Sequence, residues 1–210
     1  MNYASLKTNI NDICETTFTD DQLAMFTQQA EQKIYNTVQI PALRKNVTAA
    51  TTSSNKYLAL PSDFLYSYSM SIYTSAANVH SFLLYKDVNF MREAYPNPST
   101  TGTPKHYSQW SDGFFILGPT PDAAYNVELH YGYYPPSIVT ASTTFLGDDF
   151  DSALLNGALI EAIRFQKQEP DVIQNYEKLY LQSITLLKNA YEGRNTTDTY
   201  RSGTYKVEAS

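Results

Sequence analysis

Three histidines are the side chains of this chain whose chemistry first invites a catalytic or metal-binding interpretation. His80, His106 and His130 do not stand at the spacing of metal ligands, and no CxxC or HExxH motif accompanies them. His106 and His130 could approach each other on adjacent strands, although two neutral surface histidines explain them better. Neither GxxxxGK[ST] nor GxGxxG occurs, so a phosphate-binding loop has no support either. We predict no metal site and no cofactor.

A run of carboxylates is the second feature that could do chemistry. Asp148, Asp149 and Asp151 precede an apolar helical stripe, and Glu161 follows on the same predicted helix. Glycoside hydrolysis uses two carboxyl groups roughly 5–10 Å apart, one of them with a raised pKa. An aspartate run at a helix start has a simpler role, because it satisfies free N–H groups and matches the helix dipole. We therefore interpret the run as a helix cap and predict no catalytic residue.

Composition limits the partners that the chain can bind. Its 210 residues include 21 acidic and 15 basic side chains, a net charge of −6, with no Lys/Arg run. Sequence-independent DNA binding relies on Lys and Arg, so we expect no tight binding to DNA, although DNA could slide past such a protein.

The single cysteine, Cys14, excludes an intramolecular disulfide. No secretory signal pattern and no membrane span is expected. The 18 tyrosines favour half-buried sheet positions or protein interfaces.

Helical periodicity occurs at both ends of the chain. Residues 3–15 predict a short helix, and Thr19 opens a capping box before a second helix that Pro41 ends. Two further apolar stripes cover residues 149–190, with a break at Pro170. The residues expected on their buried faces are Phe150, Leu154, Ala158, Ala162 and Phe165 before the break, and Val172, Tyr176, Leu179, Ile184 and Leu187 after it. Striped helices need partners that cover their apolar faces. We therefore expect the helices of 3–40 and 149–190 to pack together as a bundle.

The middle of the chain predicts an antiparallel β-sheet inserted over residues 57–136. Short strands are expected at 57–60, 64–73 and 82–85, with a helical turn at 87–95 and a polar loop at 46–56. Residues 104–136 then predict a meander of three strands, in which Asp112-Gly113 marks a tight hairpin and Val127, Leu129 and Tyr131 face a core.

These elements predict an α+β fold in which residues 1–192 form a single domain. The remaining residues, 193–210, contain no Leu, Ile or Phe and cannot supply a core. They form either a disordered end or an extended arm that docks on another subunit. For the arm, the side chains expected to touch a neighbouring protein are Tyr200, Arg201, Tyr205 and Val207.

The order of these short motifs resembles that of a known protein family. Tyr57-Leu58-Ala59-Leu60-Pro61-Ser62-Asp63-Phe64 is followed by Gly102-Thr103-Pro104-Lys105-His106-Tyr107. Next come Leu117-Gly118-Pro119-Thr120-Pro121-Asp122-Ala123-Ala124-Tyr125, Glu128-Leu129-His130-Tyr131-Gly132-Tyr133 and, near Leu154, the run LLNGALIEA. Over residues 3–190 this layout resembles the head-to-tail adaptor, or head-completion, proteins of tailed bacteriophages. It is similar to that of tail tubular protein A of short-tailed phages.

The resemblance implies a structural virion protein that is assembled in the host cytoplasm. Such proteins form a ring, usually of twelve subunits, that binds the portal, extends the DNA channel and carries tail or nozzle proteins. The resemblance implies no catalytic residue, and it implies that the C-terminal arm reaches the portal. Two alternatives stay open. One is a tail-associated carbohydrate-binding module that uses Trp110, and the other is a cell-wall glycosidase that uses Asp149 and Glu161.

Overall fold

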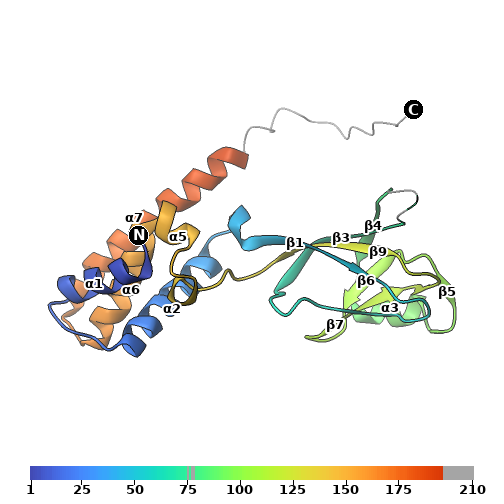
Figure 1. The fold of residues 1–210 in the computed structure, drawn as a ribbon, viewed down its shortest axis with the longest axis horizontal. Helices are drawn as coiled ribbons and strands as arrows, with labels where there is room; N and C mark the ends of the chain where they lie inside the picture. Colours follow the sequence, from blue (N-terminus) through green and yellow to red (C-terminus); the bar gives the residue numbers. More distant parts are fainter. Residues whose placement is uncertain (75, 77–78, 196–210) are drawn as a thin grey trace. The chain divides into compact units, whose positions relative to one another are not determined.

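Two compact units make up the described part of the chain. The computed structural model describes residues 1–74, 76 and 79–195 and has an α+β fold (Figure 1). The helical unit combines Met1–Pro41 with the chain from Pro135 onward, and the sheet unit is Ala42–Tyr134. Segments from both ends of the chain thus share one unit. That residues 1–192 form a single domain remains a prediction.

Helix α6 is central to the helical unit, where it contacts α1, α2, α5 and α7 (Figure 1). The helices of this unit are α1 (Tyr3–Ile13), α2 (Asp20–Thr37), α4 (Ile138–Ala141), α5 (Phe145–Asp149), α6 (Asp151–Phe165) and α7 (Pro170–Asn195). The largest fully buried side chains along α1 and α2 are Leu6, Ile10, Leu23, Phe26 and Ile34. Each buried anchor of this size contributes roughly 1.5–3 kcal/mol. Burial around α6 therefore accounts for much of the stability of this unit.

Most helices of this unit begin after a residue whose side chain caps them, but this residue is not always the expected one. Thr19 accepts a hydrogen bond from the Gln22 amide, and the Gln22 side chain returns one from the Thr19 amide, so the predicted capping box is confirmed. The predicted cap at Asp148 and Asp149 is wrong, because both residues lie inside α5, which Thr144 caps. Phe150 precedes α6 without a side-chain cap. A short helix thus occupies the segment expected to be the start of a long one.

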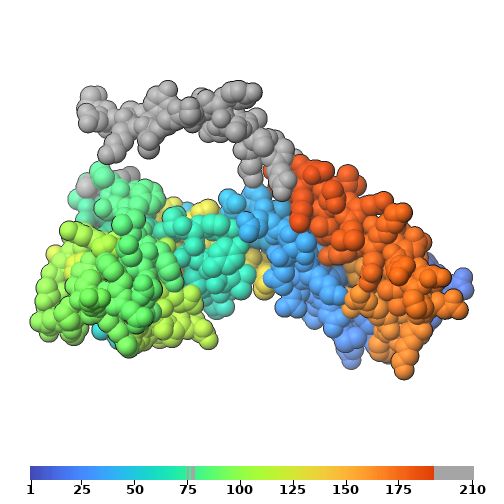
Figure 2. All heavy atoms as spheres, turned by 180° about the vertical axis from the view of Figure 1, so that it is seen from behind, coloured from blue at the N-terminus to red at the C-terminus, as the bar shows by residue number. Residues whose placement is uncertain are grey.

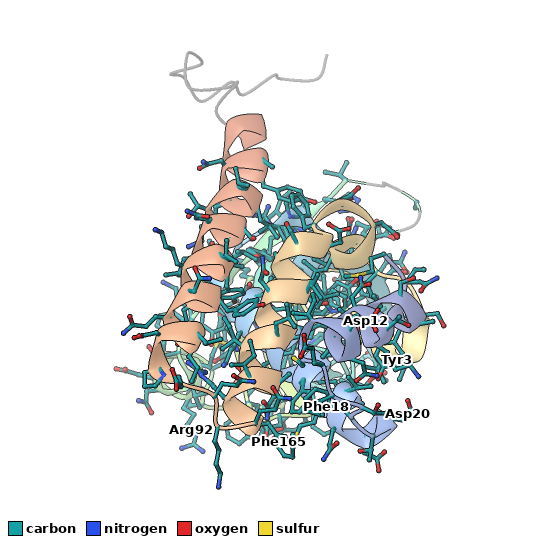
Figure 3. The ribbon with its side chains drawn as sticks, turned by 90° about the vertical axis from the view of Figure 1, so that its left-hand side faces the viewer. Tyr3, Asp12, Phe18, Asp20, Arg92 and Phe165 are labelled. Carbon is teal, nitrogen blue, oxygen red and sulfur yellow. The ribbon has the colours of Figure 1, made fainter. Side chains whose placement is uncertain are left out.

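An aromatic cluster closes one end of the helical unit. The rings of Phe18 and Phe26 meet edge to face with centroids 5.2 Å apart, and Phe165 lies 5.4 Å from Phe26 and 6.2 Å from Phe18 (Figure 3). Phe165 remains half exposed although the periodicity of α6 placed it on the buried face. The cluster holds the loop between α1 and α2 against the C-terminal end of α6.

The sheet unit contains a seven-stranded, curled and mostly antiparallel sheet in the order β1-β9-β3-β4-β6-β7-β2. Its strands are β1 (Arg44–Ala50), β2 (Tyr57–Ala59), β3 (Tyr66–Tyr73), β4 (Ser81–Tyr85), β6 (His106–Gln109), β7 (Phe114–Gly118) and β9 (Asn126–Gly132). Only the β4–β6 pair is parallel among these described strands, and α3 (Val88–Ala94) forms its crossover. A 3-10 turn, η1 (Pro41–Leu43), precedes β1, and β5 (Thr101–Gly102) pairs with β8 (Thr120–Pro121).

The core of the sheet unit fills the inside of the curled sheet. Alternate residues of β9 point inward, as their period of two predicts, and pack with residues from β2, β3, β4, β6 and β7. The buried members of this core are Leu58, Met70, Ile72, Leu83, Tyr107, Phe115, Leu117, Val127, Leu129 and Tyr131. The predicted alternation of β9 is therefore confirmed, and the sheet has an apolar interior of its own.

Two predictions for the sheet are wrong in their pairing. The expected loop at 46–56 begins as strand β1, which pairs with β9 along its full length at the edge of the sheet. The hairpin at Asp112-Gly113 joins β6 and β7 as expected, but β9 does not continue that meander. It lies instead between β1 and β3, and β2 takes the place beside β7. Long-range pairing thus overrides the local order of the strands.

Candidate functional site

The histidines lie apart in the sheet unit. His106 is on β6 and His130 on β9, with β3 and β4 between them, so the expectation that they could meet on adjacent strands is wrong. The hydroxyl of Tyr95 lies 2.7 Å from His106 Nδ1, while His130 packs against the ring of Tyr68 at 5.1 Å. Burial and the charges of nearby lysines lower the pKa of His106. Both histidines serve packing and hydrogen bonding.

A polar group on the outward face of β3 and β9 consists of Ser71, His80 and Glu128. Its geometry does not fit nucleophilic catalysis. The Ser71 hydroxyl lies 2.9 Å from His80 Nδ1, and a Glu128 carboxylate oxygen lies 3.3 Å from the same nitrogen. A catalytic triad needs its nucleophile and its acid on opposite ring nitrogens. Ser71 is also only 2 % exposed. The group is a polar ladder across strands, which the sequence did not reveal.

Glu161 is engaged in an ion-pair network that joins three helices of the helical unit. Lys33 of α2 contacts its carboxylate, and Arg164 of α6 lies 3.6 Å from it. Arg164 also contacts Glu177 of α7 at 2.6 Å. These ion pairs give Glu161 a structural explanation, whereas its proposed partner in glycoside cleavage, Asp149, lies in α5.

Metal binding and membrane insertion find no support in the described residues. No group of three His, Cys, Asp or Glu side chains there could hold a metal ion. Burial raises the pKa of the Cys14 thiol, so this cysteine behaves as a core residue. Within the same described ranges, no helix combines the length and apolar character that a bilayer span needs.

An exposed aromatic cluster marks one edge of the sheet unit. The Tyr57 ring lies 6.3 Å from that of Trp110 and 6.4 Å from that of Phe114. With Asn55 and Ser111 these rings line a hollow of about 390 Å³. The Arg92 guanidinium lies 5.0 Å from the Trp110 ring centroid, and Lys56 caps Tyr57 at 5.3 Å. This Trp110 cluster is the surface that the carbohydrate-binding alternative would use.

Helix α7 carries the most exposed apolar surface of the helical unit. Val172, Leu179 and Leu186 are 37 %, 40 % and 67 % exposed, although Val172 and Leu179 were expected on the buried face. Figure 2 shows α7, in orange to red, as an uncovered strip of this unit. The spacing i, i+7, i+14 of these residues is visible in the sequence. The predicted stripe nevertheless grouped Val172 and Leu179 with Ile184 and Leu187, which are buried.

A hollow of about 290 Å³ lies on the other flank of α7, where α7 meets α2 and α6. Gly157, Ile160, Tyr180 and Leu181 form its floor and wall. Its charged rim consists of the four residues of the ion-pair network, Lys33, Glu161, Arg164 and Glu177. We call this surface the α7 hollow, and the line of Val172, Leu179 and Leu186 the α7 ridge.

Charge is divided unequally between the units. The stretches Met1–Pro41 and Pro135–Ser210 hold nine basic and fifteen acidic residues, whereas the sheet unit holds six of each. The whole net charge of −6 therefore belongs to the chain of the helical unit. Exposed acids gather at its ends, including Asp12, Glu15, Asp21, Asp148 and Asp149.

The residues predicted for the C-terminal arm cannot be placed against these surfaces. Tyr200, Arg201, Tyr205 and Val207 lie outside the described residues. Their expected contact with a neighbouring protein therefore stays a prediction.

Comparison with known proteins gives the surfaces a context. No curated protein matches the chain. A family model described as SU10 adaptor protein matches residues 1–205, which include both units. The name of this family denotes a bacteriophage adaptor, a structural component of the virion. The chain therefore belongs to the SU10 adaptor protein family of phage head–tail adaptors.

Proposed function

We propose that the protein forms a ring, of twelve subunits in the expected case, between the portal and the tail of its phage. In this proposal the helices from both ends of the chain act as one bundle that builds the ring. The portal binds one side, tail or nozzle proteins bind the other, and the C-terminal arm docks on the portal. The expected likeness to tail tubular protein A belongs to the same proposal.

The observation that carries this proposal is the family match over residues 1–205. The match includes the helices of both chain ends as well as the inserted sheet, so it concerns the architecture as a whole and not one motif. An adaptor acts through surfaces, and the α7 flanks and the Trp110 cluster are exposed surfaces of the described part of the chain. Both surfaces provide the large apolar or aromatic contacts that protein interfaces use.

Electrostatics supports passage of DNA without binding. The chain of the helical unit carries the net charge of −6, and a negative surface repels the phosphate backbone. A ring lined by such units would let DNA slide through with little adhesion. In this proposal DNA passes through the channel and makes no specific contact with the protein.

Reconstitution with the portal tests the proposed function. Purified full-length protein is mixed with the portal protein of the same phage, and the complex is measured by analytical ultracentrifugation and negative-stain microscopy. We expect a stoichiometric complex with a closed ring of adaptor subunits. Replacing residues 194–210 by a Gly/Ser stretch should weaken incorporation while leaving the circular dichroism of the fold unchanged. A protein that binds no portal of its own phage would contradict the proposal.

The Trp110 cluster favours a second candidate, a carbohydrate-binding module carried by the adaptor. Three aromatic rings with an amide and a hydroxyl line its hollow, a combination that suits the apolar faces and hydroxyl groups of sugars. Trp110 is the only tryptophan of the chain, so its fluorescence reports on this surface alone. Titration with N-acetylglucosamine oligomers should change this emission if the module exists. If Trp110 emission does not change during the titration, either in the wild type or in Phe114→Ala, the carbohydrate-binding module is rejected.

A further inference from the structure

The two flanks of α7 differ in shape. The ridge residues Val172, Leu179 and Leu186 repeat every seven residues, so they form a line with steps of roughly 10.5 Å along the helix. Leu181 follows Leu179 by two residues, which places it roughly 200° further around the helix, and it is 62 % exposed. One flank of the helix thus protrudes as a ridge, and the other borders the α7 hollow.

Beside the hollow, Gly157 lets α6 pack closely against α2 and α7. Gly157 has no side chain, and a Cβ there would meet Ala30 Cβ at 3.1 Å and Tyr180 Cε2 at 3.3 Å. The hydroxyl oxygen of Tyr180 is buried and has no hydrogen-bond partner within the described residues. A buried polar atom left in this state costs about 1–3 kcal/mol. The walls of the hollow are therefore mainly apolar, and the Tyr180 hydroxyl lies buried behind them.

Charge favours contact between the same two flanks. Asn175 and Gln182, which border the ridge, are exposed and uncharged. The rim of the hollow carries two cations and two carboxylates that already pair with each other. Elsewhere the helical unit is acidic, so two copies would repel each other through most other surfaces. Within the helical unit, the ridge and the hollow are thus neutral surfaces through which two copies can approach.

We propose that the ridge of one copy packs into the α7 hollow of the next copy. This inference rests on the proposed ring and names the contact that builds it. Because ridge and hollow are different surfaces of one subunit, the contact is head-to-tail, and each subunit uses both. Figure 3 shows α7 beside α6, with side chains of its other sides directed away from the unit.

Single-charge variants test the two halves of the contact separately. Leu186→Glu damages the ridge, Leu181→Glu damages the hollow, and Ser5→Glu adds the same charge at an exposed position of α1 outside both. All three positions are exposed, so unchanged circular dichroism and thermal melting should confirm folding. With the portal present, we expect ring formation to weaken roughly tenfold or more for each leucine variant and to stay normal for the control.

Mixing the two leucine variants gives a signature that only a head-to-tail contact produces. The Leu186→Glu chain keeps its hollow and the Leu181→Glu chain keeps its ridge, so an equimolar mixture has one intact contact. In sedimentation equilibrium this mixture should form a 1:1 dimer and no larger oligomer. A mixture that completes rings, or single variants that assemble like the wild type, would overturn the inference while leaving the proposed function intact. A wild-type protein that forms no ring on the portal would instead refute the function.

Thiol crosslinking tests the contact without the portal. A Cys14→Ser chain that carries both Leu181→Cys and Leu186→Cys is treated at high concentration with a short bismaleimide. We expect a ladder of crosslinked oligomers, because each chain can link to two neighbours. Either single-cysteine chain should stay uncrosslinked, because its thiol faces a leucine of the next copy. Absence of the ladder would reject the ridge–hollow contact independently of portal binding.

Discussion

Glu31 is a buried carboxylate whose replacement separates the effect of its hydrogen bonds from the effect of its charge. It lies on α2, is 2 % exposed, and accepts a 2.8 Å hydrogen bond from the backbone N–H of Ile138 at the start of α4. The Ser137 hydroxyl is its second partner. Glu31 thereby fixes the chain where it re-enters the helical unit after the sheet. We consider two variants, Glu31→Ala and Glu31→Gln.

The expected magnitudes follow from these contacts. Alanine leaves the buried N–H of Ile138 without an acceptor, which costs about 1–3 kcal/mol in the free energy of unfolding. Glutamine keeps an oxygen in the same place and removes the charge. Because burial raises the pKa of Glu31, the fold disfavours its ionised form. Glu31→Gln should therefore lie within about 1 kcal/mol of the wild type at neutral pH.

The pH dependence has a definite sign. A carboxyl group whose pKa is raised by folding binds its proton more tightly in the folded state, so its contribution to stability is fully present below the unfolded pKa. That contribution is lost as the pH rises through the raised folded pKa. Stability of the wild type relative to Glu31→Gln should thus fall as the pH rises above the unfolded pKa of about 4 and through the raised folded pKa.

Urea unfolding at several pH values, followed by circular dichroism at 222 nm, measures this difference. Glu169→Gln, at an exposed position before α7, is the matched control and should track the wild type. Equal destabilisation by glutamine and alanine would refute the reasoning about the hydrogen-bond acceptor. A difference between wild type and glutamine variant that stays constant with pH would refute the reasoning about charge.

Three further substitutions test the packing of each unit. Phe115→Ala removes a fully buried ring from the sheet core and should cost about 3–5 kcal/mol, measured by urea unfolding through Trp110 fluorescence. Thr19→Ala removes half of the capping box and should cost about 1 kcal/mol, seen as a lower midpoint in circular dichroism; an unchanged midpoint would contradict it. Gly118→Ala brings a Cβ within 2.4 Å of the Tyr95 ring and should destabilise the sheet unit by about 1–3 kcal/mol. A melting temperature equal to the wild type would show that the ring moves freely.

Local signals in the sequence predicted most of the helices and strands. The capping box at Thr19, the break at Pro170 and the turn at Asp112-Gly113 each depend on residues within four positions, and each is present in the structure. The alternation of Val127 and Leu129 identified the buried face of β9 for the same reason. Short-range chemistry of this kind can be derived from one sequence.

Pairing and exposure could not be derived in that way. Strand β1 is an edge strand whose residues are nearly all exposed, so it has no apolar alternation that would distinguish it from a loop. The neighbours of β9 are residues far away in the sequence, and a hairpin was the simpler expectation. Val172 and Leu179 look like core residues because exposed apolar side chains on a helix can have the same periodicity as those that face the core.

The two chain ends of the sheet unit lie next to each other. The amide of Tyr133 donates to the Leu43 carbonyl at 3.0 Å, and Arg44 is paired with Gly132 in the β1–β9 ladder. A segment whose ends meet can be cut out as a cassette, since a short linker restores the continuity of what remains. Residues 42–134 are thus a replaceable module. Exchange of that module could change the surface that the chain presents while the fold of the helical unit stays the same.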